Sequence, residues 1–135
     1  MSRSDPPVAG RHALVIDDDL ALRGLFTALL TRKGFTVDVA GDGRVAFDQL
    51  TRHNYSVILL DLMMPDVNGF ELLERMERDS PSLLKRVIVM TGAAQRQVAR
   101  VNASNVWDVI RKPFDIDHLV SSAIACSEGR QRGNA

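Results

Sequence analysis

Four consecutive apolar residues, Val57 to Leu60, run directly into the carboxylate of Asp61. An uninterrupted apolar run of this kind is typical of a strand in a parallel sheet that is covered on both faces. Ligands of open α/β sheets bind just beyond the carboxyl ends of such strands, which makes Asp61 a candidate site residue. On this segment alone, a turn or a helix cap explains Asp61 better, because aspartate is common at both. Other segments must therefore decide its role.

Five segments have the composition of strands, since they are short, apolar or rich in β-branched residues, and bounded by turn-forming residues. They are residues 13–16, 35–39, 55–60, 86–91 and 106–110. Between and after them, apolar residues recur at the three- and four-residue spacing of a helix face. These faces span residues 22–30, 45–50, 72–76, 98–101 and 116–124. Because each helix is long enough to serve as a crossover, we expect one parallel α/β sheet with helices on both faces.

The composition of the chain limits its class. Its 135 residues fit one domain, which we expect over residues 11–127 with polar tails at 1–10 and 128–135 and no output domain. Lys plus Arg and Asp plus Glu both total 17, so nothing indicates direct binding to nucleic acid or to a membrane. Cys126 is the only cysteine, which excludes an internal disulfide. No signal peptide or apolar span is present in the sequence, so we expect a cytoplasmic protein.

Four widely separated sequence positions place polar groups at or just after strand ends: the Asp17-Asp18 pair, Asp61, Thr91 and Lys112. Parallel strands would gather them at one sheet edge. Carboxylates about 4 Å apart repel each other by roughly 4 kcal/mol per pair at an effective dielectric of 20, so they either protonate or hold a cation.

Oxygen ligands select a hard ion such as Mg²⁺. Lys112 and Thr91 would satisfy phosphoryl oxygens, and Asp61 would be the nucleophile of a phosphoryl transfer. Singly, each of these residues fits a helix cap, a strand-end hydroxyl or a surface charge better; their joint placement favours a site. The three histidines, His12, His53 and His118, follow no metal-ligand spacing and read as surface residues.

The chain resembles response-regulator receiver domains, the family of the bacterial chemotaxis regulator. The likeness covers roughly residues 11–127 and rests on four motifs. These motifs are Val15-Ile16-Asp17-Asp18-Asp19, Asp61-Leu62-Met63-Met64-Pro65 with Asn68-Gly69, Met90-Thr91-Gly92, and Lys112-Pro113-Phe114. The resemblance implies the flavodoxin-like receiver fold with strand order 2-1-3-4-5.

The resemblance also implies a function. Asp61 would accept a phosphoryl group from a histidine kinase or a histidine phosphotransferase and thereby switch binding to a downstream protein. Mg²⁺ would be held by Asp18, Asp61 and the main-chain carbonyl of Met63, and by Asp17 through water. Thr91, Gly92 and Lys112 would contact the phosphoryl group. The Lys112-Pro113 peptide bond would be cis, which is uncommon for X-Pro bonds in general.

Two features depart from the family pattern. Val109 stands where the family usually has Tyr or Phe, and the interval from Thr91 to Lys112 is one residue short. Both departures fall on the face that the family uses for output. Strand alternation predicts that Trp107 shares a face with Val109. Its indole would then lie against the fourth helix and take over part of the coupling between the phosphorylation site and the output face. Trp107 as a simple apolar cover for the end of the sheet explains the residue equally well.

Three functional hypotheses follow. The first is a phosphorylatable signalling switch that is not an enzyme in the ordinary sense, since it promotes only its own phosphorylation and dephosphorylation. The second is an Mg²⁺-dependent aspartyl-phosphate phosphatase, but such enzymes resemble Asp-x-Asp-x-Thr at the nucleophile, and Met63 stands where their general acid would be. The third is a receiver-like binding module that is never phosphorylated, which the complete acidic set argues against.

Overall fold

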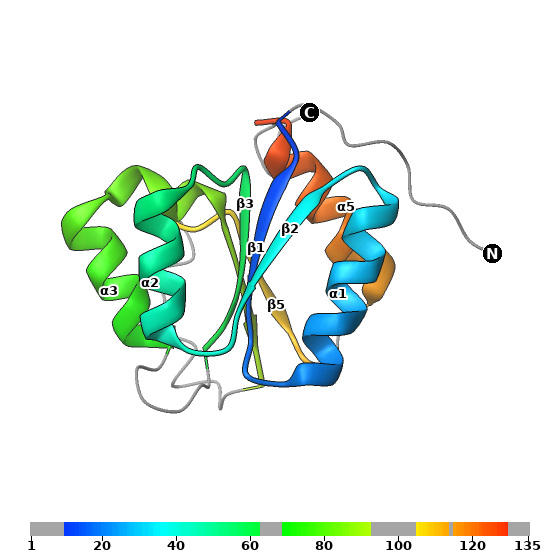
Figure 1. The fold of residues 1–135 in the computed structure, drawn as a ribbon, viewed down its shortest axis with the longest axis horizontal. Helices are drawn as coiled ribbons and strands as arrows, with labels where there is room; N and C mark the ends of the chain where they lie inside the picture. The colour runs from blue at the N-terminus through cyan, green and yellow to red at the C-terminus, as the bar shows by residue number, and fades with distance from the viewer. Residues whose placement is uncertain (1–9, 63–68, 93–104, 114, 130–135) are drawn as a thin grey trace.

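A computed structural model describes residues 10–62, 69–92, 105–113 and 115–129 of the chain. A five-stranded parallel sheet with the order β2-β1-β3-β4-β5 forms the centre of the fold (Figure 1). The strands are β1 (His12–Ile16), β2 (Thr36–Ala40), β3 (Val57–Asp61), β4 (Val87–Thr91) and β5 (Asp108–Arg111). The helices are α1 (Leu20–Arg32), α2 (Gly43–Arg52), α3 (Gly69–Asp79) and α5 (Ile116–Ser127), with a 3-10 helix, η1 (Pro81–Arg86). The predicted α/β fold and strand order are confirmed.

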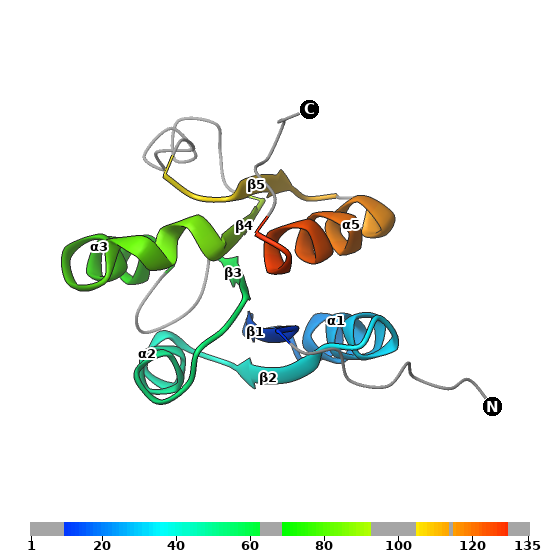
Figure 2. The same ribbon diagram turned by 90° about the horizontal axis from the view of Figure 1, so that it is seen from above.

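Helices cover both faces of the sheet, as Figure 2 shows, with α1 and α5 on one side and α2 and α3 on the other. Each side has its own core. We call them the α1/α5 core, to which Phe26, Leu30 and Leu119 belong, and the α2/α3 core, to which Leu72 and Met76 belong. Every residue of β3 and β4 is buried, as the apolar runs predict for central strands.

Local sequence signals fix where two helices begin. The side chain of Asp19 accepts hydrogen bonds from the backbone N–H groups of Ala21 and Leu22 and so caps α1. Asp115 caps α5 in the same manner. Aspartate is a favoured N-cap residue, so the sequence itself predicts both caps. Because Asp19 closes the turn between β1 and α1, it helps to hold the preceding aspartates at the end of β1.

Two strands begin two residues later than predicted. β3 begins at Val57 instead of Tyr55, and β5 begins at Asp108 instead of Val106. The carbonyl of Tyr55 accepts a hydrogen bond from the side chain of Arg86, 3.1 Å away, instead of extending the ladder. The helix predicted over residues 98–101 lies outside the described residues, as do all but residues 10, 128 and 129 of the tails predicted at 1–10 and 128–135.

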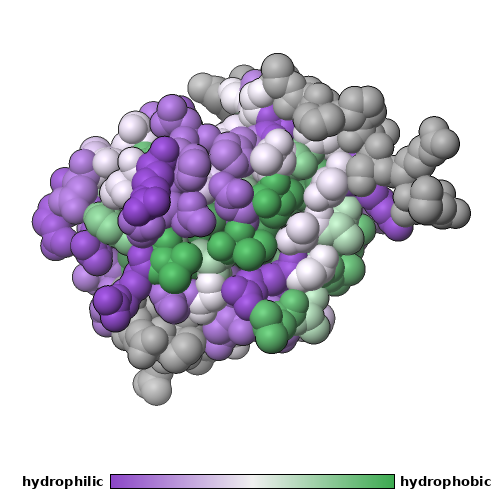
Figure 3. All heavy atoms as spheres, viewed as in Figure 1, coloured by the Kyte–Doolittle hydropathy of each residue, from purple (hydrophilic) through white to green (hydrophobic). Residues whose placement is uncertain are grey.

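The edge strand β2 lies exposed between α1 and α2. Figure 3 shows apolar side chains reaching the surface over this side of the molecule, interspersed with polar ones. Among the described residues, the large exposed apolar side chains are those of Leu20, Leu25, Val39 and Val45. Scattered apolar residues of this kind are common on protein surfaces. No helix within the described ranges has the length and apolar character needed to cross a membrane.

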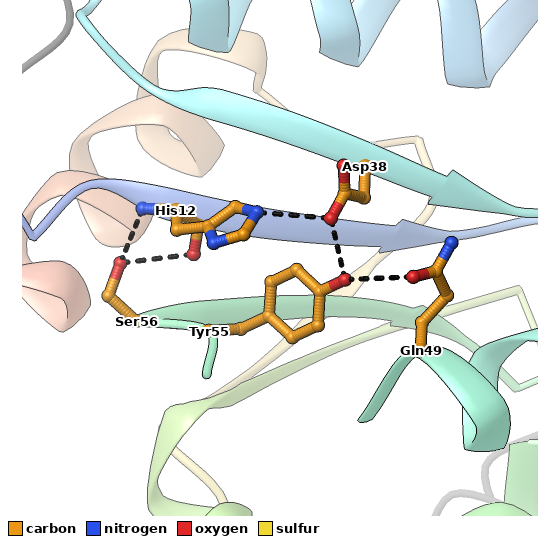
Figure 4. Close-up of polar contacts among 5 residues, drawn as sticks. All are labelled: His12, Asp38, Gln49, Tyr55 and Ser56. Atoms are coloured by element: carbon orange, nitrogen blue, oxygen red, sulfur yellow. Dashed lines mark hydrogen bonds and ion pairs between the residues drawn. The ribbon is translucent and has the colours of Figure 1, made fainter. Parts of the chain in front are cut away.

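A polar network ties the edge strand to the body of the sheet (Figure 4). Asp38 of β2 accepts a hydrogen bond from the hydroxyl of Tyr55 at 2.7 Å, and its carboxylate lies 3.0 Å from Nε2 of His12. The hydroxyl of Tyr55 also lies 3.5 Å from Oε1 of Gln49 in α2. His12 is therefore partly buried and makes a structural contact, which its prediction as a surface residue did not include.

The Tyr55→Phe variant should lower the free energy of unfolding by about 1.5 kcal/mol, the low end for a hydrogen bond to a charged group, because Asp38 is partly exposed. The pKa of Asp38 is lowered from 3.8 against the effect of its burial, chiefly by the hydrogen bonds from Tyr55 and His12. The stabilisation that ionised Asp38 contributes is therefore present above pH 3.8. It is lost as the pH falls through the lower pKa that Asp38 has in the folded protein. Urea unfolding at neutral pH measures the difference, and an unchanged midpoint would contradict the role of the network.

Candidate functional site

The carboxyl ends of four neighbouring strands place polar residues in one row, at the lower end of the sheet in Figure 1. Asp17 directly follows β1, Asp61 ends β3, Thr91 ends β4, and Lys112 directly follows β5. β1 and β3 are adjacent parallel strands, and Ile16 pairs with Leu60, so Asp17 and Asp61 lie side by side. The helix that follows β1, α1, and the helix that follows β3, α3, lie on opposite faces of the sheet (Figure 2). This is a topological switch point, where open α/β sheets bind their ligands.

Three carboxylates converge at this point. One oxygen from each of Asp17, Asp18 and Asp61 lies within 4.8 Å of the others. Asp17 is fully buried and Asp61 almost so, whereas Asp18 is exposed to solvent. The predicted convergence of these residues is therefore observed.

One oxygen of the buried Asp17 has no hydrogen-bond partner among the residues that the structure describes. Oδ1 accepts a hydrogen bond from the backbone N–H of Asp19 at 2.9 Å, but Oδ2 is buried without a hydrogen bond. Burial raises the pKa of Asp17 to about 6, and the negative charges of Asp61 and Asp18 add to this effect. The Asp19 N–H and Lys112 act in the opposite direction. An unpaired buried carboxylate oxygen beside two further carboxylates fits a hard divalent cation such as Mg²⁺.

The positive charge at the site comes from Lys112. Its Nζ lies 3.5 Å from Oδ2 of Asp61, and the backbone N–H of Lys112 donates to the carbonyl of Thr91 at 2.8 Å. This backbone bond connects the residues that follow β4 and β5. Because the lysine side chain is partly exposed, its ammonium group remains reachable from solvent while it contacts Asp61.

All but one of the remaining predicted site residues lie within the described part of the chain. Gly92 lies beside the aliphatic part of the Lys112 side chain, and the Lys112-Pro113 bond is cis, as the resemblance implies. Thr91 is buried at the end of β4. Met63, whose main-chain carbonyl was predicted to bind the metal, lies outside the described residues.

Trp107 and Val109 do not share a face of the sheet. Trp107 packs against the α1/α5 core, whereas Val109 packs against the α2/α3 core. The prediction from strand alternation is wrong because β5 begins only at Asp108, and the backbone bends at residues 106 and 107. The fourth helix, against which the indole was expected to lie, falls outside the described residues.

Gly69, which the sequence analysis names only within a motif, contacts the backbone of the site directly. The backbone N–H of Gly69 donates to the carbonyl of Leu62 at 2.8 Å, and the α-carbon lies against the peptide that joins Asp61 to Leu62. The glycine after Asn68 was the available signal in the sequence. A helix start and a close backbone approach look alike there, however, so the sequence alone does not reveal the contact.

Comparison with known proteins identifies the family. The sequence model of the response regulator receiver domain matches residues 13–124. The transcriptional regulatory protein TcrA of Mycobacterium tuberculosis is 31% identical over 120 residues, which cover 89% of this chain and 47% of TcrA. The chain thus spans about half the length of this curated relative. The chain belongs to the response regulator receiver domain family, the phosphoacceptor modules of two-component signalling.

Solved structures show the same fold. The receiver domain of the Francisella response regulator 1452 is 26% identical, with a TM-score of 0.77 and coverage of 88% of this chain and 98% of that one. The response regulator TrrA of Thermotoga maritima, solved in complex with Mg²⁺ and beryllofluoride, is 23% identical, with a TM-score of 0.74 and coverage of 86% and 98%. The second likeness extends to the fold alone.

The Asp17→Asn variant tests the buried carboxyl group. The pKa of Asp17 is raised from 3.8 to about 6 on folding, so without metal its ionisation lowers stability as the pH rises through this range. The asparagine variant has no carboxyl group at this position and so lacks this destabilising ionisation. Its stability relative to wild type should therefore increase by about 1 kcal/mol between pH 5 and pH 7.5. Urea unfolding in excess chelator measures the difference, and a constant difference across the range would refute the buried charge.

Proposed function

We propose that Asp61 accepts a phosphoryl group and that its phosphorylation switches the binding of a downstream protein. The observation that carries the proposal is the position of Asp61. It ends the central strand β3 with two carboxylates within 4.8 Å and the ammonium group of Lys112 at 3.5 Å. Such an arrangement presents a nucleophilic carboxylate between a candidate cation site and a fixed positive charge. It suits phosphoryl transfer, in which catalysis consists mainly of positioning and electrostatic stabilisation.

Asp17, Asp18 and Asp61 would hold Mg²⁺, with the main-chain carbonyl of Met63 as a further ligand by resemblance. The fit is supported by the buried Oδ2 of Asp17, which has no hydrogen-bond partner among the described residues, and by the all-oxygen donor set. When bound, the ion would neutralise charge that develops on the phosphoryl oxygens. It would also offset the burial and the carboxylate repulsion that together raise the pKa of Asp17.

The protein residues then have separate roles. A carboxylate oxygen of Asp61 forms the new bond to phosphorus while the phosphorus–nitrogen bond of a phosphohistidine donor breaks. The Lys112 ammonium group, already 3.5 Å from Asp61, pairs with a phosphoryl oxygen. The Thr91 hydroxyl and the backbone of Gly92 contact the other oxygens. No proton has to leave Asp61, because the nucleophile is the ionised carboxylate.

The donor would be a sensor histidine kinase or a histidine phosphotransferase, and the receiver of the signal another protein or protein region. We place the exchange in the cytoplasm. The chain is a switch rather than an enzyme acting on a separate substrate. Multiple turnover on a small phosphate ester would instead favour an aspartyl-phosphate phosphatase, and the absence of any labelling would favour a binding module that is never phosphorylated.

Incubation with acetyl phosphate and Mg²⁺ should add one phosphoryl group to the wild type, detected by intact mass. The Asp61→Asn variant should show none, because an amide cannot act as the nucleophile. The Asp48→Asn variant serves as a matched control, since it makes the same change on the exposed surface of α2, where Asp48 pairs with Arg52. Undiminished labelling of Asp61→Asn would exclude this residue as the acceptor.

Mg²⁺ should be required for labelling, since only a divalent cation offsets three converging carboxylates while an anionic phosphoryl group approaches. The exposed Asp18 allows a test that leaves the core intact. Asp18→Ala should raise the Mg²⁺ concentration needed for half-maximal labelling about tenfold or more, whereas Asp48→Ala should leave it unchanged. Labelling is measured over a Mg²⁺ titration, and equal labelling in excess chelator would show that the metal argument is wrong.

A further inference from the structure

We propose that Gly69 is a positioning residue for Asp61. The missing side chain at the start of α3 allows the helix to rest directly on the Asp61–Leu62 peptide, and this contact fixes the phosphoacceptor relative to Asp17 and Lys112. The inference rests on the proposed function, because it concerns the same site. It adds a residue that touches neither the phosphoryl group nor the metal.

The contact leaves no room for a side chain. A β-carbon at position 69 would lie 2.5 Å from the α-carbon of Leu62, 2.7 Å from the carbonyl oxygen of Asp61 and 3.0 Å from the carbonyl carbon of Leu62. All three atoms belong to the backbone, so no side-chain rotation relieves the overlap. Any larger residue at position 69 must therefore push α3 and the end of β3 apart.

The backbone of Leu62, which lies beneath Gly69, is held by a hydrogen bond on each side of its α-carbon. The N–H of Leu62 donates to the carbonyl of Met90 in β4 at 3.2 Å, and the carbonyl of Leu62 accepts from the N–H of Gly69 at 2.8 Å. Leu62 itself is fully buried. The Asp61 carbonyl and the Asp61 side chain share one α-carbon. A displacement of the Asp61–Leu62 peptide therefore changes the position of the carboxylate.

Conformational freedom does not explain the glycine. Its φ lies outside the left-handed region, and it occupies the first position of a helix, where alanine is intrinsically favoured over glycine. Close approach is the remaining physical reason for a residue without a β-carbon. Gly24 in α1 provides the contrast, because a β-carbon there would meet no atom within 4 Å.

The Gly69→Ala variant should therefore keep its helix but misplace Asp61. Misplacement of a reacting group by about 1 Å costs on the order of 100-fold in rate, so a displacement of about half an ångström should slow labelling by acetyl phosphate about tenfold. The Mg²⁺-induced rise in Tm should also shrink, because the three carboxylates no longer converge as in the wild type. The second readout does not depend on phosphoryl transfer.

Two controls separate positioning from stability. Gly24→Ala makes the same chemical change in open space and should leave labelling and the Mg²⁺-induced shift at wild-type values. Met76→Val removes volume from the buried face of the same helix, away from Asp61, and should lower Tm without changing either readout while the protein is folded. If Gly69→Ala folds poorly, the Gly24→Ala/Gly69→Ala double variant carries the same clash in a helix-stabilised background.

The outcomes are distinguishable. Slow labelling and a reduced Mg²⁺ shift in folded Gly69→Ala, with both controls normal, would support the positioning role. Wild-type values in folded Gly69→Ala would overturn the proposal, and so would equal losses in Met76→Val. It would also be overturned if neither Gly69→Ala nor the double variant folds. Gly69 would then be a packing residue. A wild type that binds Mg²⁺ but is never labelled would sink the proposed function, while the Mg²⁺ shifts would still test the positioning of Asp61.

Discussion

The burial of Asp17 beside Asp61 is the constraint on which the candidate site depends. Two carboxylates at the ends of adjacent parallel strands repel each other, and the second oxygen of the deeper one has no hydrogen-bond partner within the described ranges. The backbone N–H of Asp19 donates to Asp17, and β5 brings the ammonium group of Lys112 to Asp61. These do not fully compensate, because the pKa of Asp17 is still raised to about 6. The charge imbalance left over is what makes the site ready for a cation.

Such an imbalance carries a cost in stability, which the rest of the molecule must offset. β3 and β4 are buried along their whole length, and two separate cores cover the sheet. The polar network of Asp38, Tyr55 and His12 lies away from the site and holds the edge strand against the sheet. Stabilising contacts thus lie away from the carboxyl edge, while uncompensated charge is concentrated there. This division is common where a site stores unfavourable interactions for function.

The sequence was informative where one local signal sufficed. Continuous apolar runs that stop at a carboxylate or hydroxyl located the site ends of β1, β3 and β4, and aspartate caps located α1 and α5. Contacts between distant segments were not accessible. Nothing in the order of residues reveals that Tyr55 reaches Asp38, or that its carbonyl is taken by Arg86 so that β3 begins at Val57. The close approach of Gly69 is likewise a tertiary contact.

The faces of β5 limit how a change at Thr91 can spread through the protein. Along β4, Val89 faces the α2/α3 core and Met90 the α1/α5 core, so alternation places Thr91 on the face of Val89. Val109 pairs with Val89 and packs against the same core, whereas Trp107 packs on the opposite side. A movement of Thr91 transmitted by direct packing along its own face therefore meets a small side chain. The indole cannot replace an aromatic residue at position 109, because the sheet itself lies between them.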